Sequence, residues 1–334
     1  MHSARQAMSR RKPNTKRLID RTPPSGTASR SREGTIVAHY GVAVDVRLDD
    51  GQRQSVRVKR RSGHVVGDRV RVTGERLKRL ARQSLLRRRD ARGGIHVVAA
   101  NLQVLGIVVA PLPPTPGGFV ERAIVAARAA DITPFLVINK SDLAGHPQLV
   151  NELGADYPRA ILRTFPISAI TGDGMDALRQ FFSEGFRGAF VGSTGVGKSS
   201  LLNTLCPDID LEVGDLNPQS GLGRHTTSAS TLHTIPGGGE LIDTPGFRDF
   251  GLIDITSREL ATHFPGFEKA LETPCRFRDC HHDTEPDCSV REAVLDGSVT
   301  EARYDTYCRL LSEVRDAEDA ARRRGRPLPP RPLV

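Results

Sequence analysis

The periodicity of apolar and polar residues divides the chain into a strand-rich first part and a mixed second part. Between residues 34 and 73, short runs alternate apolar with polar or basic side chains, as in Arg69–Thr73, and glycine-containing turns separate them. Alternation with a period of two predicts strands that are buried on one face only. Several such strands at close spacing predict a small closed β-barrel of the oligonucleotide-binding (OB) type. We expect order to begin near Gly34 and assign residues 34–92 to this barrel and a basic linker.

A different pattern begins near residue 97, where apolar runs of strand length alternate with helical patterns. The expected strands lie at residues 105–110, 135–138, 160–167 and 188–191, and the expected helices lie at residues 120–130 and 173–184. Two further strands are joined by Gly237–Gly239. Strands that alternate with helices predict an α/β fold with a parallel sheet covered on both faces. We assign residues 93–254 to this domain.

The two ends of the chain and the segment before the second end have other compositions. Residues 255–320 are mostly helical in pattern and contain a cluster of cysteines and histidines. Residues 1–33 and 321–334 are rich in Arg and Pro and poor in large apolar side chains, so we expect disorder in both.

The net charge of +9 is concentrated in the first segment, where residues 1–32 hold nine basic residues and one acidic residue. Such a tail is suited to contact RNA, and the alternative is a tail that only keeps the protein soluble. A second basic run, from Arg76 to Arg92, has few aromatic residues in it. It therefore favours contact with RNA phosphates over base stacking, and the alternative is an ordinary solvated surface.

The lengths of the apolar runs and the spacing of the cysteines indicate the cellular compartment in which the protein is expected. No apolar run approaches the roughly 18 residues that span a membrane, and the N-terminus has no apolar core of a secretory signal. We therefore expect a cytoplasmic protein with no membrane partner. Five cysteines at uneven spacing argue against a disulfide framework.

The sequence GSTGVGKSS matches the phosphate-binding P-loop pattern G-x-x-x-x-G-K-S. An apolar strand precedes it and a helical run follows it, which is the context that such a loop requires. Its backbone N–H groups would surround the phosphates at the positive end of the new helix. Lys198 would reach the terminal phosphates, and Ser199 would ligate Mg²⁺. The expected phosphate-binding residues are Gly192, Ser193, Thr194, Gly195, Val196, Gly197, Lys198, Ser199 and Ser200.

A motif for base recognition, N-K-x-D, stands at the carboxyl end of a predicted strand and consists of Asn139, Lys140, Ser141 and Asp142. The Asp142 carboxylate can accept both the ring N–H and the amine of guanine, and the Lys140 stem can lie against the ring. Asn139 can bond the purine and neighbouring loops. The backbone N–H of Ala169, which follows Ser168, can donate to the guanine carbonyl. Adenine presents the opposite pattern and would leave groups unpaired at roughly 1–3 kcal/mol each, so the motif predicts GTP.

A third motif, D-x-x-G, spans Asp243–Gly246. Asp243 would hold the shell of Mg²⁺ through water, and the N–H of Gly246 would meet the γ-phosphate. A threonine of the preceding loop can complete the metal shell, and Thr226 and Thr227 remain alternatives for this role.

The order of these motifs is informative. GTPases usually carry the P-loop first and the base-recognition motifs last, whereas this chain carries N-K-S-D and S-A ahead of the P-loop. The order predicts a circularly permuted GTPase domain. Permutation is physically allowed because the termini of a domain often lie close together at its surface.

A cluster of potential metal ligands lies in the helical region. Cys275, Cys280 and Cys288 accompany two adjacent histidines, His281 and His282. Three thiolates and one imidazole form a closed tetrahedral set that suits structural zinc and leaves no position for a catalytic water. Adjacency alone leaves either histidine as the fourth ligand.

Taken together, these motifs resemble the family of ribosome small subunit-dependent GTPase A. The resemblance rests on N-K-S-D, S-A, GSTGVGKSS, GLGRHTT, DTPGF and C-x4-C-x-H-x5-C, and it covers residues 34–320. It implies an N-terminal OB-fold, a permuted GTPase domain and a C-terminal zinc domain in which His282 is the fourth ligand. The chain departs from the family at Ala100–Gln103, which reads A-N-L-Q in place of A-N-V-D, and in its long basic tail.

The resemblance also implies GTP hydrolysis that the small ribosomal subunit stimulates, with a role in late maturation of that subunit. The partners would be the subunit, its rRNA, GTP and GDP, and we expect a monomer. The alternative is a nucleotide-gated RNA-binding scaffold with negligible turnover.

The source of the catalytic power is a separate question. Many GTPases carry a Gln directly after D-x-x-G to orient the attacking water, whereas this chain carries Phe247 there. His225, which resembles the His of the family's R-H-T motif, is the candidate to orient or partly deprotonate the water. The alternative is a histidine that contacts RNA or only packs the loop.

Overall fold

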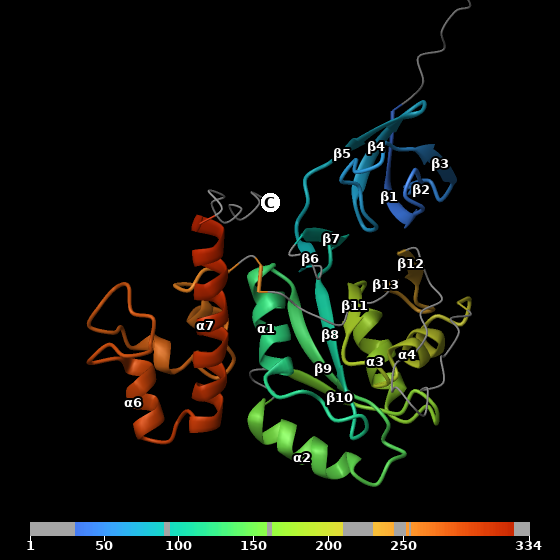
Figure 1. Ribbon diagram of the computed structural model, residues 1–334. Coiled ribbons are helices and arrows are strands. Elements are labelled where there is room, and N and C mark those ends of the chain that lie inside the picture. Colours follow the sequence, from blue (N-terminus) through green and yellow to red (C-terminus); the bar gives the residue numbers. More distant parts are fainter. Residues whose placement is uncertain are drawn as a thin grey trace, which may run out of the picture.

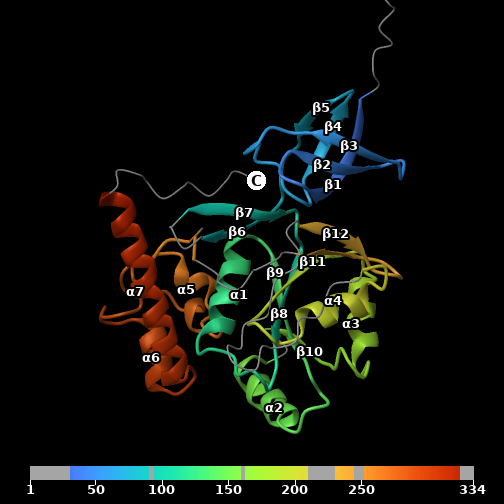
Figure 2. The ribbon, with the colours of Figure 1, turned by 45° about the vertical axis from the view of Figure 1, so that its right-hand side comes forward.

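A computed structural model describes residues 31–89, 94–158, 162–209, 230–243, 252–253 and 255–323. Figures 1 and 2 show three parts: a small barrel, a central α/β domain and a helical domain that lies beside helix α1. The barrel lies at the end of the central domain that carries β12 and β13.

The barrel is built from five strands in the order β3-β2-β1-β4-β5. They are β1 (Arg32–His39), β2 (Ala43–Leu48), β3 (Arg53–Arg57), β4 (Arg69–Thr73) and β5 (Arg76–Arg79). All of these pairs are antiparallel, and the side-chain amide of Gln54 donates to the Gly74 carbonyl at 3.0 Å across the remaining gap between β3 and β5. This partly open five-stranded barrel confirms the predicted OB-type fold.

The alternating pattern of the sequence explains the interior of the barrel. Its core holds the inward-facing aliphatic residues of these strands: Ile36, Val44, Val46, Leu48, Val56, Val70 and Val72. The basic run that follows contains β5 and β6 (Leu85–Arg89). Strand β6 pairs with β7 (Ile95–Ala100) in a separate two-stranded sheet between the barrel and the central domain.

The central domain is a six-stranded part of the main sheet in the order β10-β9-β8-β11-β13-β12. The strands are β8 (Val104–Val109), β9 (Thr133–Ile138), β10 (Arg163–Pro166), β11 (Arg187–Val191), β12 (Thr231–Thr234) and β13 (Glu240–Asp243). The prediction of a parallel sheet is confirmed for β8 to β11 and β13 but is wrong for β12, which runs antiparallel to β13. The short turn Gly237–Gly239 explains this, because a parallel pair requires a crossover of a dozen or more residues.

Helices cover both faces of this sheet, as predicted. They are α1 (Phe119–Ala129), α2 (His146–Asp156), α3 (Met175–Phe182) and α4 (Lys198–Leu205). Helices α1 and α2 pack on one apolar cluster of the sheet, and α3 and α4 pack on the other. Helix α2 was not predicted, and the reason is that only His146 of this helix is fully buried, so its apolar periodicity is weak.

The barrel and the central domain share one sheet, and one apolar cluster of the central domain extends into the barrel. Ala38 of β1 pairs with Thr231 of β12, so the main sheet continues from β10 to β3. Val37 and Val66 of the barrel belong to the same apolar cluster as Ile242 of β13. The barrel is therefore packed directly on the β12–β13 hairpin.

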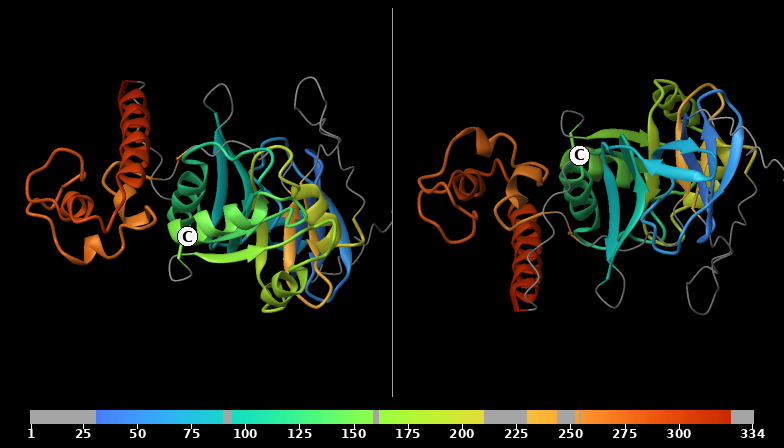
Figure 3. Two further views of the ribbon diagram at one scale, coloured as in Figure 1. Left: turned by 90° about the horizontal axis from the view of Figure 1, so that it is seen from below. Right: turned by 90° about the horizontal axis from the view of Figure 1, so that it is seen from above.

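The helical domain consists of α5 (Leu260–His263), the 3₁₀ helix η1 (Ala270–Glu272), α6 (Ser289–Leu295) and α7 (Glu301–Arg323). Its core contains Phe264, Phe267 and Tyr307, and it includes Val125 and Ala129 from α1. Figure 3 shows α7 running alongside the central domain in views from below and above. Within the described ranges, the structure contains no helix that is long and apolar enough to cross a membrane.

Candidate functional site

The P-loop connects the end of β11 to the start of α4 and depends on two glycines. A side chain at Gly192 would place its Cβ only 2.4 Å from the carbonyl oxygen of Val108. Gly197 has a φ of +96°, and a Cβ there would lie 2.2 Å from Nδ2 of Asn139. Both positions therefore exclude larger residues, since real Cβ atoms do not approach other heavy atoms so closely.

Lys198 is the first residue of α4, and its side chain folds back over the P-loop. Its Nζ donates to the carbonyl oxygens of Gly192 and Ser193 at 2.8 and 2.9 Å. The lysine charge is thus held at the mouth of the loop, beside the N-terminus of α4, where backbone N–H groups favour anions. Ser199 and Ser200 lie in the first turn of the same helix.

Asn139 joins the two base-recognition motifs to the P-loop. Its side chain is 2% exposed, and its Nδ2 donates to the carbonyl oxygen of Val196 at 2.8 Å. Its Oδ1 accepts the backbone N–H of Ala169 at 3.0 Å. One buried amide therefore fixes the relative positions of three loops.

The backbone N–H of Ala169 has a partner inside the protein, because it donates to Oδ1 of Asn139. Its donation to the guanine carbonyl stays a prediction. The motif reveals which loops meet but not which acceptor a given N–H finds inside the protein.

The carboxylate of Asp142 is exposed and oriented by a serine. The hydroxyl of Ser168 donates to Oδ1 of Asp142 at 2.6 Å. This hydrogen bond is the main reason that the pKa of Asp142 lies below its ordinary value. The carboxylate is therefore ionised at neutral pH and acts only as an acceptor, as recognition of guanine donors requires.

The remaining residues of the N-K-S-D loop shape it. Lys140 has a φ of +70°, and its Nζ donates to the carbonyl oxygen of Leu112 at 2.6 Å. Burial lowers the pKa of this lysine. The backbone N–H of Ser141 donates to the carbonyl oxygen of Ile167 at 2.9 Å, which ties the loop to the end of β10.

Asp243 lies at the carboxyl end of β13, on the same edge of the sheet as the P-loop. Burial raises the pKa of its carboxyl group, and the charge of Lys198 opposes that rise. Asp243 and Lys198 thus follow neighbouring parallel strands, β13 and β11, at this edge of the sheet. The other predicted switch and catalytic residues, His225, Thr226, Thr227 and Gly246, lie outside the described residues.

A second site lies in the helical domain, where the loop after η1 brings three thiols and one imidazole together. One ligand atom from each of Cys275, Cys280, His282 and Cys288 lies within 4.8 Å of the others. Nδ1 of His282 lies 3.3 Å from Sγ of Cys288, and the sulfurs of Cys275 and Cys288 are 4.0 Å apart. Ligands of a tetrahedral zinc ion at about 2.3 Å are themselves separated by distances of this order. The chemistry of the donor set and its spacing fit a tetrahedral metal.

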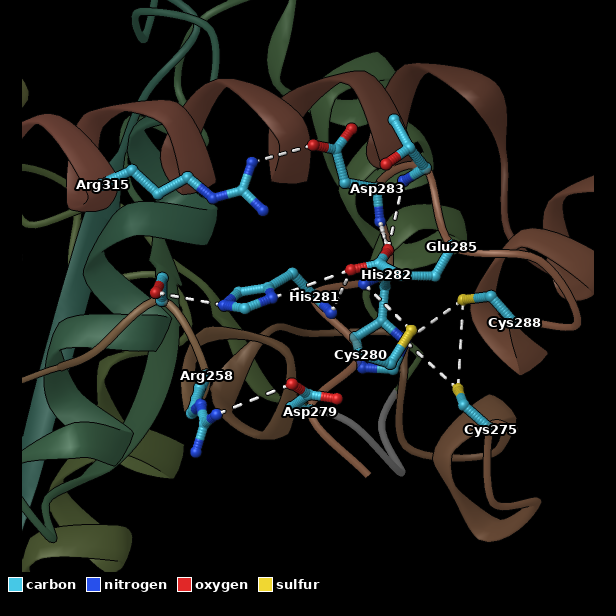
Figure 4. A network of polar contacts seen from close by, with 12 residues as sticks. Arg258, Cys275, Asp279, Cys280, His281, His282, Asp283, Glu285, Cys288 and Arg315 are labelled. Atoms are coloured by element: carbon cyan, nitrogen blue, oxygen red, sulfur yellow. Dashed lines mark hydrogen bonds and ion pairs between the residues drawn. The ribbon is translucent and has the colours of Figure 1, made fainter. Parts of the chain in front are cut away.

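The neighbouring histidine faces away from this cluster (Figure 4). Nε2 of His281 lies 3.4 Å from the hydroxyl of Ser257, and its Nδ1 lies 3.7 Å from Glu285. Burial raises the pKa of Glu285, but backbone N–H groups that donate to it outweigh this and lower the pKa to about 2. The geometry thus distinguishes His282, whose ring faces the cysteines, from His281, although their adjacency in the sequence left either histidine as the possible fourth ligand.

Helix α7 holds the loop that carries this cluster. The hydroxyls of Tyr304 and Tyr307 donate to the backbone carbonyls of His282 and His281 at 2.8 and 2.6 Å. Arg315 pairs with Asp283 at 2.8 Å, as Figure 4 shows. The cluster is therefore anchored to the core of the helical domain and is not an isolated loop.

Three features meet at one edge of the mixed sheet: a P-loop, a guanine-recognition loop that comes earlier in the chain, and an aspartate at the end of β13. Together they define a circularly permuted GTPase. Comparison with known proteins places the chain within this class. The model of the RsgA GTPase family matches residues 79–253, and the chain belongs to this family.

Relatives and solved structures agree with this assignment. The chain is 38% identical over 304 residues to the small ribosomal subunit biogenesis GTPase RsgA of Pseudomonas fluorescens Pf-5, covering 87% of this chain and 88% of the relative. It is 39% identical to the protein of the same name from Azotobacter vinelandii, with 88% and 89% of the two chains covered. The crystal structure of YjeQ from Thermotoga maritima is similar with a TM-score of 0.67 at 29% identity, covering 85% of this chain and 98% of that one. YloQ, described as a circularly permuted GTPase, has a TM-score of 0.66 at 25% identity, with 87% and 98% covered.

Proposed function

We propose that this chain is a GTPase of small ribosomal subunit biogenesis, which binds the subunit with GTP and hydrolyses GTP in response to it. The observation that carries the proposal is the pair of Asn139 hydrogen bonds, which unite the base-recognition loops and the P-loop in one site. The names of its relatives as small ribosomal subunit biogenesis GTPases support the choice of partner. We place the protein in the cytoplasm as a monomer.

Guanine is recognised at the edge formed by Asp142 and Ser168. The ionised carboxylate, held by the serine hydroxyl, accepts the ring N–H and the exocyclic amine. Asn139 keeps Ala169 and Val196 in place while the base binds. We include Lys140 and Ser141 in the base site because they fix the path of this loop.

The phosphates bind in the P-loop, from Gly192 to Ser200. Lys198 exchanges its backbone carbonyl partners for phosphate oxygens, which gain more from a cation than neutral carbonyls do. Mg²⁺, when bound with GTP, neutralises phosphate charge, and Ser199 and Asp243 are the residues that would hold it. Thr226 or Thr227 and the N–H of Gly246 complete this shell and the contact with the γ-phosphate.

Hydrolysis requires a group that orients the attacking water, and the proposal assigns this role to His225. Phe247 occupies the place of the usual glutamine and has no atom that can bond water. The imidazole of His225 would hold the water and accept its proton as the β–γ phosphoanhydride bond breaks, giving GDP and phosphate.

The Cys275–Cys288 cluster holds one structural zinc ion in this proposal. The ligand set is closed, and Tyr304 and Tyr307 connect the loop that carries it to the core of the helical domain. Zinc would therefore contribute folding energy to residues 255–320 and take no part in GTP chemistry.

The surface of the barrel supports an RNA partner. Exposed basic side chains lie on its outer faces: Arg53, Arg57, Lys59, Arg76, Lys78 and Arg79. Arg82, within the basic run, forms an ion pair with Asp68, which is 0% exposed. The exposed basic side chains of the barrel can thus contact phosphates of ribosomal RNA, whereas the ion pair of Arg82 stabilises the fold.

The test measures the GTPase rate of the full chain with and without purified small ribosomal subunits. We expect strong stimulation for the wild type. We expect His225→Ala to bind GTP as tightly as the wild type but to lose the stimulated rate by about 10²–10⁴-fold. A flat response of the wild type to subunits would instead identify a nucleotide-gated RNA-binding scaffold, and full turnover by the His225 variant would remove that residue from catalysis.

A further inference from the structure

Thr204 lies near the end of α4, and its hydroxyl reaches the turn that carries Ala169. Oγ1 of Thr204 is in donor geometry toward two carbonyl oxygens, that of Ala169 at 3.0 Å and that of Ser200 at 2.8 Å. The segment that forms the P-loop ends at Ser200, so Thr204 stands outside the sequence motifs of the nucleotide site. Only the fold reveals its contact with the base-recognition turn.

The two acceptors do not need the hydroxyl equally. A hydroxyl carries a single hydrogen, so it donates to one of them at a time. The carbonyl of Ser200 stands four residues before Thr204 in α4, where the helical ladder pairs it with the backbone N–H of Thr204. The carbonyl of Ala169 lies in a turn, which has no such ladder. The hydroxyl therefore supplies Ala169 with a donor that comes from another part of the chain.

Ala169 is thereby held on both sides of its backbone. Its N–H donates to Oδ1 of Asn139 at 3.0 Å, and its carbonyl accepts the hydroxyl of Thr204. Ala169 is 9% exposed and belongs to the same apolar cluster as Leu201 and Leu205 of α4. Hydrogen bonds and packing together fix this residue between the N-K-S-D loop and α4.

The neighbours of Ala169 make its position important for base recognition. Ser168 directly precedes it, and the Ser168 hydroxyl donates to Asp142 at 2.6 Å. The backbone N–H groups of Ile170 and Thr171 donate to the same hydroxyl oxygen at 3.3 and 3.1 Å. A shift of Ala169 would thus move the serine that orients the carboxylate.

The opposite end of α4 begins at Lys198, in the P-loop. Six residues of helix separate Lys198 from Thr204, which corresponds to about 9 Å along the helix axis. The backbone carbonyl of Thr204 also accepts Nη2 of Arg179 at 3.3 Å, which joins α3 to α4 at this point. One short helix therefore connects the phosphate end of the site to the base end.

We propose that Thr204 is a positioning residue, which fixes the base-recognition turn Ser168–Ala169 relative to the P-loop. Without the hydroxyl, the turn would lose its bond to α4 while its bond to Asn139 remains. A site whose parts are already in place loses less freedom on binding, so the Thr204 bond raises the affinity for a complete nucleotide. This inference deepens the proposed function, on which it rests, by adding a residue that sets nucleotide affinity from outside the motifs.

Thr204→Val tests the proposal, because valine keeps the shape of the side chain and removes the hydroxyl. Calorimetric titrations of the full chain use GDP, a non-hydrolysable GTP analogue and inorganic tripolyphosphate, which presents phosphates without a base. We expect the affinity for both nucleotides to fall about 3- to 10-fold, the usual effect of one hydrogen bond. The affinity for tripolyphosphate should stay within about twofold of the wild type. With subunits present, KM for GTP should rise with the loss of affinity, and kcat should stay within about twofold.

Three further variants complete the comparison. Thr204→Ser keeps the hydroxyl and should restore nucleotide affinity to within about twofold of the wild type. Thr204→Ala provides the same comparison as the valine variant if that variant does not fold. Thr306→Val is the matched control, since the hydroxyl of Thr306 donates to the carbonyl of Ala302 at 3.0 Å within α7. It should leave all three affinities unchanged.

Unchanged nucleotide affinity on loss of the Thr204 hydroxyl would overturn the proposal. Equal losses for the nucleotides and for tripolyphosphate would also overturn it, because they would show that Thr204 supports the P-loop helix and not the base-recognition turn. A wild-type chain that binds tripolyphosphate but no guanine nucleotide would contradict the proposed function itself, which is a different result from failure of the positioning role.

Discussion

Asn139 and Asp142 are three residues apart, but their side chains have different partners. Asn139 is buried, and both polar atoms of its amide form hydrogen bonds within the protein, with Val196 and Ala169. Asp142 is exposed, and Ser168 occupies only one of its oxygens with a hydrogen bond. The first residue therefore builds the site, and the second remains available for the base.

Asp142→Asn tests this division of labour. An amide replaces one acceptor with a donor, so at least one guanine N–H group would lose its partner, at about 1–3 kcal/mol per group. We expect GTP affinity to fall roughly 10- to 100-fold and affinity for xanthosine triphosphate, which has a carbonyl in place of the amine, to rise. Competition binding measures both. Asp176→Asn, on the exposed surface of α3, is the control and should change neither.

Equal losses of GTP and xanthosine triphosphate binding by Asp142→Asn would show that Asp142 supports the loop and does not read the base.

Residue types and spacing identify the loops of this site but not the hydrogen bonds between them. The partner of the Ala169 N–H depends on how three distant loops pack. In the same way, only the path of the backbone turns His282 toward the cysteines and His281 away from them.

At the scale of elements, the β12–β13 hairpin connects the nucleotide site to the barrel. Glu240 at the start of β13 pairs with Arg187 of β11 at 2.7 Å and with Arg47 of the barrel strand β2. Arg187 also donates to the carbonyl of Gly67 in the barrel at 3.2 Å. One half-buried carboxylate thus links the barrel to the strand that ends in Asp243.

The pH dependence of stability should reveal this link. Burial raises the pKa of Glu240, but Arg187 and Arg47 outweigh it, so the pKa lies below its ordinary value. A depressed pKa stabilises the fold above the pKa of the unfolded chain, about 4.3, and this stability is lost as the pH falls through the folded-state value. We expect Glu240→Gln to destabilise the protein by about 1–3 kcal/mol at pH 7.

Denaturant titrations at several pH values measure this difference between variant and wild type, which should shrink as the pH falls below about 4. Glu184→Gln is the control, since Glu184 lies in an exposed ion pair with Arg163 at 3.9 Å. A Glu240→Gln penalty that stays constant down to pH 3 would show that the side chain contributes through packing and not through its charge.

Secondary-structure patterns predicted these elements unequally. Strongly periodic or fully apolar segments, such as β8 and α3, lie close to their predicted positions. Helix α2 is largely solvated, and the direction of β12 depends on a three-glycine turn, so neither has a clear apolar signature. The contact between β1 and β12 joins residues far apart in sequence, and no local pattern encodes it.

At the scale of the whole molecule, the barrel has two cores of different kinds. Val72 belongs to the closed core inside the barrel. Val37, on the same sheet, belongs to the large cluster that continues through Val66 into the central domain, where it meets Leu232 and Ile242. The β12–β13 hairpin is therefore supported from outside the GTPase domain, by a module whose own interior is independent of it.

Paired valine substitutions separate the two cores. Each Val→Ala change removes two methyl groups from a buried site and should cost about 2 kcal/mol. We expect Val37→Ala to accelerate amide hydrogen exchange in residues 231–243 and to weaken the stabilisation of the protein by GDP. Val72→Ala, the matched control, should accelerate exchange in the barrel strands only. Exchange in β12 and β13 that responds equally to both variants would mean that barrel and GTPase domain unfold as one unit, whereas a response to neither would mean that the shared core does not support the hairpin.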